Sequence, residues 1–331
     1  SQRNFHLRTA GTGRKVCNFP EEVTSMSHIA CGLLQIDPSG FESAHGFRVF
    51  LTAKMSALAQ AGAALIVLPA YSVMIGPALQ IEAEGPSPCS PFELATLVGT
   101  DGFSLWMDFF AAAALSNKIY LCPGTFIAPC DGGFEHCAPL FSPDGDLALA
   151  QLQTHVSEAE DRAGMAAGAD LAVVDVRGHK VGIAIGTDAW YPEVGRILAL
   201  LGADTILAPT AAPAPYTVWH QTRGLWQVVQ QNQVFAVEAS LAGRWLGTTY
   251  QGRSRVFGPV EMTPDGRGVL SEVTSESIEG EIIASLDPVD LEIARRAFPI
   301  FEHFNIGLYE ARLADAYLVG RPARVKPNGR V

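Results

Sequence analysis

Residues 181–201 read VGIAIGTDAWYPEVGRILALL, and this stretch decides the fold. It begins with a short, mainly apolar run, which indicates a buried strand. A turn follows, and Pro192 then opens a helix, because its fixed φ and missing N–H suit a first helical turn. Apolar residues recur at 194, 197, 198 and 201, and Gly202 ends the run. The stretch therefore predicts a strand, a sharp turn and an amphipathic helix.

The same alternation of strand and helix continues in both directions along the chain. Short apolar runs bounded by turn residues predict strands, and apolar residues at helical spacing predict helices. We expect strands at 28–35, 64–69, 119–122, 171–176, 181–185, 205–208, 234–240 and 281–286, and helices at 47–61, 101–117, 192–201, 219–232 and 288–297. Pro-Asp-Gly at 143–145 and 264–266 and Arg-Gly-His-Lys at 177–180 indicate hairpins. Together these elements predict a mixed α/β fold built in layers.

Composition argues against several classes of protein. The net charge of −11 is opposite to the basic surface that nucleic-acid binding needs. Apolar runs such as 63–69 and 111–115 are too short to span a bilayer, and the first 25 residues lack the apolar core of a signal peptide. Six cysteines without a CxxC pair do not read as a disulfide framework or a zinc site. We expect a cytoplasmic protein with no metal, no cofactor, no nucleic-acid partner and no membrane association.

Three segments of the sequence, one after another along the chain, carry the residues that bear on function. The first is Leu65-Ile-Val-Leu-Pro-Ala-Tyr-Ser72, and the second is Gln153-Thr-His-Val156, which follows a Pro-Asp-Gly hairpin. The third is Gly182-Ile-Ala-Ile-Gly-Thr-Asp-Ala-Trp-Tyr-Pro-Glu193, and a Gln231-Asn232 pair comes later. Over roughly residues 27–290 the chain resembles the nitrilase superfamily of carbon-nitrogen hydrolases. That resemblance implies a four-layer αββα sandwich and a site where a glutamate, a lysine and a cysteine act together.

The chain departs from that family at all three of these positions. The resemblance places Ala70 where the family has its glutamate base, Gln153 where it has its lysine, and Gly186 where it has its cysteine nucleophile. Alanine cannot accept a proton, glycine offers no nucleophile, and glutamine carries no charge. The sequence therefore predicts that the usual hydrolysis is lost.

Other polar residues near these segments are candidates for a changed role. The candidate catalytic residues are His155, Glu158, Glu160, Asp188 and Tyr71, and the candidate ligand-binding residues are Thr187, Trp190, Tyr191 and His220. In the family a second glutamate follows the lysine, and Glu158 or Glu160 fits that place. We also expect the Gln153 amide and the backbone N–H groups of Thr187 and Asp188 to donate to a ligand oxygen.

Three hypotheses about function remain open. The first is a small-molecule site that binds a carbonyl or carboxylate compound, with or without a non-hydrolytic reaction such as cyclisation, dehydration or isomerisation. The second is a pseudoenzyme that serves as an interaction or regulatory subunit, which predicts a collapsed pocket. The third is an amide or nitrile hydrolase with a relocated nucleophile, which predicts a cysteine or serine beside a base.

Local charge and composition, together with this resemblance, predict the organisation of the chain and its assembly. Residues 1–26 form a basic arm, 27–297 the nitrilase-like domain, and 298–331 a C-terminal tail. The family pairs its sandwiches, and the tail is rich in aromatic and aliphatic residues without a place in a single core. We therefore expect a homo-oligomer, a dimer or larger, with the tail at its interface.

Overall fold

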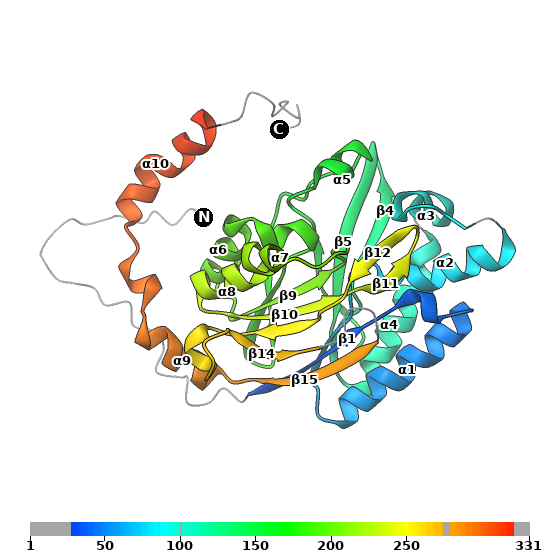
Figure 1. Ribbon diagram of the computed structural model, residues 1–331, viewed down its shortest axis with the longest axis horizontal. Helices are drawn as coiled ribbons and strands as arrows, with labels where there is room; N and C mark the ends of the chain where they lie inside the picture. The colour runs from blue at the N-terminus through cyan, green and yellow to red at the C-terminus, as the bar shows by residue number, and fades with distance from the viewer. Residues whose placement is uncertain (1–27, 86, 100, 274–278, 321–331) are drawn as a thin grey trace, which may run out of the picture.

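Two β-sheets face each other in the computed structural model, which describes residues 28–85, 87–99, 101–273 and 279–320. Helices cover the outer face of each sheet, so the layers run helix, sheet, sheet, helix (Figure 1). The predicted four-layer αββα sandwich is confirmed. This arrangement buries both faces of each sheet, which is why the central strands are apolar on both sides.

The first sheet has seven strands in the order β15-β1-β2-β3-β5-β4, with β6 paired to β5. Its strands β1, β2 and β3 are parallel, and the others join antiparallel. The strands are β1 (Ile29–Gln35), β2 (Leu65–Val67), β3 (Tyr120–Cys122), β4 (Phe126–Cys130), β5 (Gly133–Phe141), β6 (Leu147–Leu152) and β15 (Gly280–Leu286).

The second sheet has six strands in the order β14-β13-β10-β9-β8-β7, and its central strands β10, β9 and β8 are parallel. The strands are β7 (Val173–Val176), β8 (His179–Ile183), β9 (Thr205–Thr210), β10 (Phe235–Ser240), β13 (Arg255–Phe257) and β14 (Val269–Glu272). A separate two-stranded ribbon pairs β11 (Ala242–Trp245) with β12 (Thr248–Gln251).

The helices fall into two groups and a tail. Beside the seven-stranded sheet lie α1 (Ala44–Gln60), α2 (Ser72–Glu84), α3 (Pro91–Val98) and α4 (Ser104–Asn117). Beside the six-stranded sheet lie α6 (Pro192–Leu200) and α8 (Leu225–Asn232). The remaining α-helices are α5 (Glu158–Arg162), α7 (Val218–Arg223), α9 (Pro288–Ala297) and α10 (Ile306–Val319). Short 3-10 turns are η2 (Pro38–Gly40), η3 (Asp101–Phe103), η4 (Gly186–Trp190), η5 (Val260–Met262) and η6 (Ile300–His303).

Three apolar clusters hold the layers together. One lies between α1, α2, α4 and the first sheet, a second lies between the two sheets, and a third lies between α6, α8 and the second sheet. Along β10 the side chains alternate, so Val237 enters the cluster between the sheets and Ala236 enters the cluster under the helices. The same alternation sets the direction of Glu238 on β10, two residues after Ala236.

The sequence pattern missed some elements and merged others. Helix α2 is buried from Ser72 to Leu79 and contains Pro77, so it lacks the amphipathic stripe that marks a surface helix. The single helix expected at 219–232 is instead two helices, α7 and α8, which meet at Gly224. Propensity alone does not reveal either feature, because burial overrides it.

Of the two predicted appendages, the structure describes part of the C-terminal tail but not the N-terminal arm. The basic arm at residues 1–26 lies outside the described part of the chain. The tail includes η6 and α10, and α10 stands away from the sandwich on the side of α6 (Figure 1). Within the described residues, none of the helices combines the length and apolar character needed to cross a bilayer.

Candidate functional site

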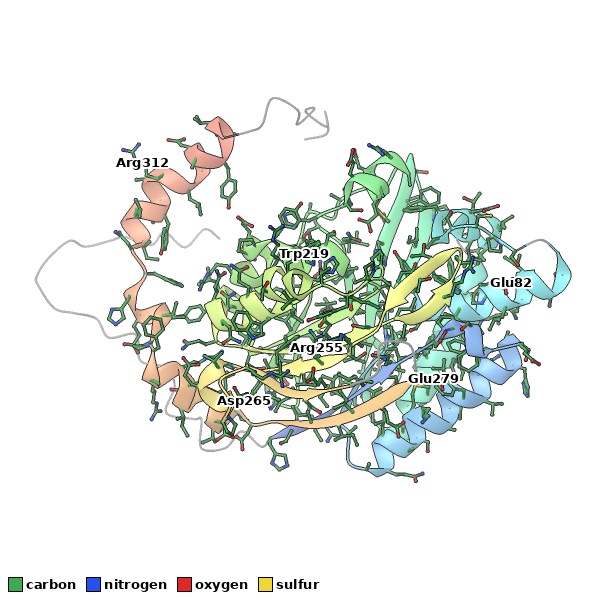
Figure 2. The ribbon with its side chains drawn as sticks, in the orientation of Figure 1. Glu82, Trp219, Arg255, Asp265, Glu279 and Arg312 are labelled. Atoms are coloured by element: carbon green, nitrogen blue, oxygen red, sulfur yellow. The ribbon has the colours of Figure 1, made fainter. Side chains whose placement is uncertain are left out.

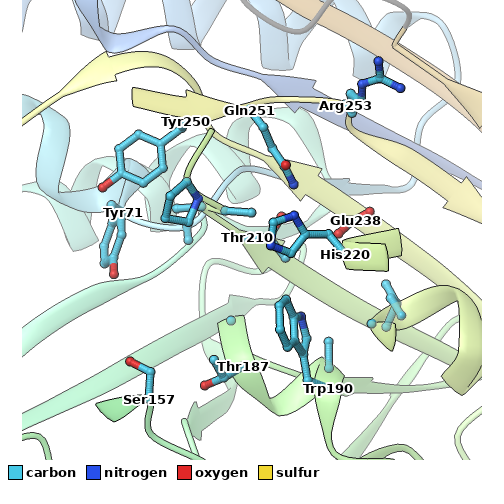
Figure 3. Close-up of a pocket in the computed structure, with 18 of the residues that line it drawn as sticks. Tyr71, Ser157, Thr187, Trp190, Thr210, His220, Glu238, Tyr250, Gln251 and Arg253 are labelled. Carbon is cyan, nitrogen blue, oxygen red and sulfur yellow. The ribbon is translucent and has the colours of Figure 1, made fainter. Parts of the chain in front are cut away.

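A cavity of about 440 Å³ opens at the carboxyl ends of the central strands. Ala70 follows β2, Gly186 follows β8 and Thr210 ends β9, and all three line the cavity (Figure 3). Ligand sites in α/β folds recur at this edge, because strands end there and the connecting loops can diverge. The fold thus brings the predicted segments to a single concave place.

The three positions that depart from the family pattern lie together. Ala70 and Gly186 form part of the cavity wall, and Gln153 lies just behind it with 1% of its surface exposed. Gly186 has φ +53°, and a Cβ added there would find Gln153 Nε2 at 4.0 Å as its only neighbour within that range. The space beside Gly186 is therefore open, although its backbone conformation favours glycine.

The Gln153 side chain is fully engaged in hydrogen bonds. Its Nε2 donates to His155 O at 2.8 Å, to Glu160 Oε2 at 3.1 Å and to Thr187 Oγ1 at 2.9 Å. Its Oε1 lies 2.6 Å from His136 Nδ1. An amide NH₂ has only two protons, so three acceptors already exhaust it. The expectation that Gln153 donates to a ligand is wrong.

His136 continues this network into the cavity wall. Because Gln153 Oε1 can only accept, His136 Nδ1 carries the proton, and Nε2 accepts from Thr125 Oγ1 at 2.6 Å. Thr125 Oγ1 in turn accepts from the backbone N–H of Tyr71 at 3.0 Å. Burial lowers the pKa of His136 below its ordinary value of 6.5, which matches the neutral ring that this pattern requires.

Sequence reasoning missed both His136 and Thr125. His136 lies within β5, where a lone histidine in an apolar strand gives no sign of a polar partner. Its ring stacks on Tyr71, with centroids 5.3 Å apart and planes 9° from parallel. Tyr71 has φ +64° and lines the cavity, and desolvation raises the pKa of its phenol, so the hydroxyl stays protonated.

Asp188 organises the turn after β8. It is completely buried, and its carboxylate accepts from the backbone N–H groups of Thr154, His155 and Ile185. Its own backbone N–H donates to Ile185 O at 3.0 Å. Asp188 N–H is therefore not available to a ligand oxygen, contrary to expectation, and the carboxylate ties Gln153's loop to the Gly186 turn.

The structure separates the other predicted residues into two groups. Tyr71, Glu160, Thr187, Trp190 and His220 line the cavity. Glu158 does not line it, because its side chain is 80% exposed and pairs with Arg162 on the outer face of α5. His155 and Tyr191 also lie outside, with their rings stacked 4.0 Å apart. Of the two glutamates offered for the family's second glutamate, Glu160 is the one that contacts position 153.

The far wall of the cavity holds polar residues that the sequence did not single out. They come from β10, β12, β13, the link between β12 and β13, and the loop before α7, and they are Glu238, Tyr250, Arg255, Arg253 and Tyr216. Burial raises the pKa of Glu238 above its ordinary 4.5, an effect that Arg255 partly offsets, and raises the pKa of Tyr250 to about 12. Charged residues at every second position of a strand would have indicated a polar sheet face from the sequence. β10 has only one charged residue, Glu238, so this signal is missing.

No cysteine among the described residues lines the cavity. Burial raises the pKa of the Cys122 and Cys137 thiols to about 12, so both stay protonated at neutral pH. The side chains of the described ranges also contain no cluster of three histidine, cysteine, aspartate or glutamate residues suited to a metal ion.

Known proteins resemble this chain in sequence and in fold. It is 32% identical to an (R)-stereoselective amidase of Pseudomonas over 168 aligned residues. The aligned stretch covers 50% of this chain and 57% of the amidase. Over 230 residues it is 26% identical to a probable nitrilase of Schizosaccharomyces pombe, covering 68% of this chain and 76% of that protein.

A solved structure with the same fold is a double mutant of the amidase from Nesterenkonia sp. AN1. Its glutamate-to-glutamine and cysteine-to-alanine changes are present together, and the crystal holds acrylamide. The TM-score is 0.65 at 19% identity, covering 84% of this chain and 97% of that one. The family model for carbon-nitrogen hydrolases matches residues 31–296. The chain therefore belongs to the carbon-nitrogen hydrolase family.

Proposed function

We propose that this chain binds a small carbonyl compound in the family's cavity and does not hydrolyse it through a covalent cysteine intermediate. The observation that carries the proposal is the hydrogen-bonding of Gln153. A neutral amide at this position has a hydrogen-bond partner for each of its polar atoms, and its oxygen accepts the Nδ1 proton of His136, which a lysine cannot do. The family's lysine would instead present a cation here.

The size of the cavity supports a ligand site over a purely structural subunit. A subunit without a ligand predicts a collapsed pocket, whereas about 440 Å³ falls in the range of small-molecule sites. The wall also mixes aromatic rings with a few polar groups, which is the usual composition of such sites. The pseudoenzyme that acts only by contact with other proteins is thus the weaker alternative.

A relocated nucleophile receives little support. The described cysteines lie outside the cavity wall, and the lining hydroxyl of Ser157 caps α5 by accepting from the N–H of Glu160 at 3.3 Å. Thr187 Oγ1 accepts from Gln153 and donates to His155 O. Among the residues that the structure describes, neither hydroxyl donates a hydrogen bond to a histidine or a carboxylate that would take its proton.

The Nesterenkonia double mutant supports amide binding without the reactive pair. That protein holds acrylamide although its glutamate and cysteine have been replaced. We infer that a cavity of this fold keeps affinity for small carbonyl compounds when those two side chains are gone. Of the five candidate catalytic residues, Tyr71 and Glu160 line the cavity, so these two would transfer protons in any non-hydrolytic reaction.

The first experiment asks whether hydrolysis is absent. Mass spectrometry of the protein with a panel of nitriles and amides should show neither product nor covalent adduct, because losing one member of a cooperating set already costs several orders of magnitude in rate. A thioester on any cysteine of the chain would contradict the proposal and favour the relocated nucleophile.

The second experiment restores the missing groups. The triple variant Ala70→Glu, Gln153→Lys, Gly186→Cys should be acylated by an activated ester at the introduced thiol faster than the natural cysteines are. A matched control carries Gly62→Cys, which adds a thiol at an exposed helix end that also has positive φ. Equal reactivity of the two introduced thiols would show that this is not a hydrolase cavity.

A further inference from the structure

Glu238 and its cross-strand partner Arg255 are charged residues on a sheet face whose other side chains beside Glu238, Ala236 and Ala208, are small and apolar. On β10 its register partners are Ala208 of β9 and Arg255 of β13. The neighbouring side chains on this face, Ala236 and Ala208, belong to the apolar cluster beneath α6 and α8. The alternation along β10 therefore turns the Glu238 carboxylate toward the helices, where it lines the cavity (Figure 3).

Within the described residues, the Glu238 carboxylate accepts no hydrogen bond and forms no close ion pair. Its only interaction there is the longer-range attraction of Arg255. Arg255 forms its close ion pair with Glu272 and not with Glu238. Its Nε, which has no hydrogen-bond partner in the described part of the chain, lies 3.6 Å from Glu272 Oε2, and its guanidinium lies 5.3 Å from the centroid of the Tyr216 ring. The lone pairs of Glu238 therefore remain available to the contents of the cavity.

The other charges of the cavity are already used. Glu160 accepts from Ser157 N at 2.7 Å and from the Gln153 amide. Arg253 lies 3.9 Å over the Tyr216 ring, and in Figure 3 its guanidinium points away from Trp190 and Tyr71. Glu238 is thus the cavity's one carboxylate without such hydrogen bonds in the described part of the chain, and it can only accept.

A carboxylate that is shielded from water and accepts no hydrogen bond weakens a fold, and the longer-range attraction of Arg255 offsets that cost only in part. A bound donor would restore both the hydrogen bonds and the charge balance. We propose that Glu238 binds the ammonium or other cationic N–H group of the cavity's ligand, which is then a small amine that also carries a carbonyl. That the ligand carries a carbonyl rests on the proposed function, whereas that it carries an amine rests on Glu238 alone.

Calorimetric titration with four simple probes tests the proposal. The probes are 4-aminobutanamide, butanamide, succinamate and butylamine, which present an amine with an amide, a neutral amide, an acid with an amide, and an amine alone. We expect 4-aminobutanamide to bind about 10- to 100-fold more tightly than butanamide, the range of a hydrogen bond to a charged group. Succinamate should bind more weakly than butanamide because it brings a second anion to Glu238.

The matched variants are Glu238→Gln and Glu82→Gln. Glu238→Gln should bring the ratio of 4-aminobutanamide affinity to butanamide affinity down to about one. Glu82 is exposed on α2, far from the cavity, so Glu82→Gln makes the same chemical change without effect on any probe (Figure 2).

The outcomes separate the two claims. If no amide binds, the proposed carbonyl site fails, and butylamine then decides the inference by itself. Binding of butylamine that Glu238→Gln abolishes upholds the amine site. Absence of any amine binding that depends on Glu238, or a preference for succinamate over butanamide, overturns it.

Discussion

The side-chain oxygen of Gln153 lies 2.6 Å from His136 Nδ1, and this contact fixes the tautomer of the buried histidine. The ring must donate from Nδ1 and accept at Nε2 from Thr125, so the chain of hydrogen bonds has a single consistent direction. A lysine at position 153 would have no acceptor for that Nδ1 proton. The loss of the family's lysine and the state of His136 are therefore coupled.

The first prediction concerns Gln153→Lys alone. The substitution removes the acceptor of His136 Nδ1–H and buries an ammonium group, so the free energy of unfolding should fall by about 2–4 kcal/mol. Chemical denaturation at neutral pH measures this change. The control Gln227→Lys places the same substitution at an exposed position of α8 and should change the unfolding free energy by under about 0.5 kcal/mol. Equal effects of the two variants would contradict the coupling.

The second prediction concerns Gly186→Ala. An added Cβ meets no atom closer than 4.0 Å, so the cost comes from φ +53° alone and should be about 1 kcal/mol. Gly195→Ala on α6 serves as comparison, because its Cβ would lie 2.3 Å from Val228 Cγ1. Overpacking there should cost about 1–3 kcal/mol. Thermal unfolding should therefore rank Gly195→Ala as the more damaging variant, and the reverse order would mean that the cavity beside Gly186 is filled.

The third prediction concerns the pH dependence of stability in Glu238→Gln. Desolvation raises the folded-state pKa of Glu238 above its ordinary 4.5, so the folded protein disfavours the ionised form. Below pH 4.5 both the folded and the unfolded state are protonated, and this cost is absent. As the pH rises from there through the folded-state pKa, the wild-type protein loses stability, because ionisation then favours the unfolded chain.

Glutamine does not titrate, so the stability of Glu238→Gln relative to wild type should increase between pH 4.5 and neutrality. Urea unfolding at several pH values, without ligand, follows the difference. Arg255 lies across from Glu238 in register and His220 lines the same cavity, so both are kept unchanged in this series. A relative stability that falls with rising pH would mean that Glu238 gains more from Arg255 than burial costs.

The fourth prediction concerns assembly. Helix α10 leaves its apolar side chains exposed, with Leu313 at 53%, Leu318 at 63% and Val319 at 87%, and α6 beside it exposes Leu200 at 59%. Exposed apolar surface of this extent marks a protein interface. We expect light scattering at micromolar concentration to give at least two chain masses, and Leu313→Glu to shift the protein toward one.

Arg312→Glu is the control for that shift, because it adds negative charge at an exposed polar position on the same helix. Figure 2 shows Arg312 on the outer part of the tail. A single chain mass for the wild-type protein would rule the oligomer out. Equal dissociation by both variants would point to charge repulsion in place of an apolar contact.

Much of the fold follows from local pattern. The strand, turn and helix of residues 181–201 appear as β8, η4 and α6, because a short apolar run and a proline at the first helical turn act within a few residues. Helix α2 escaped prediction for a tertiary reason, since it is enclosed by other elements and needs no polar face. The split between α7 and α8 at Gly224 likewise depends on packing over the cavity.

The sequence by itself determined which groups occupy positions 70, 153 and 186, because residue identity does not depend on folding. The order of strands and helices also predicted a layered α/β fold, and the resemblance to the nitrilase superfamily implied its αββα arrangement. Only the tertiary structure decided which polar groups are available, because hydrogen bonds join residues far apart in the chain. Gln153 is satisfied by Glu160, Thr187 and His136, whereas Glu238 is left with a cavity in front of it.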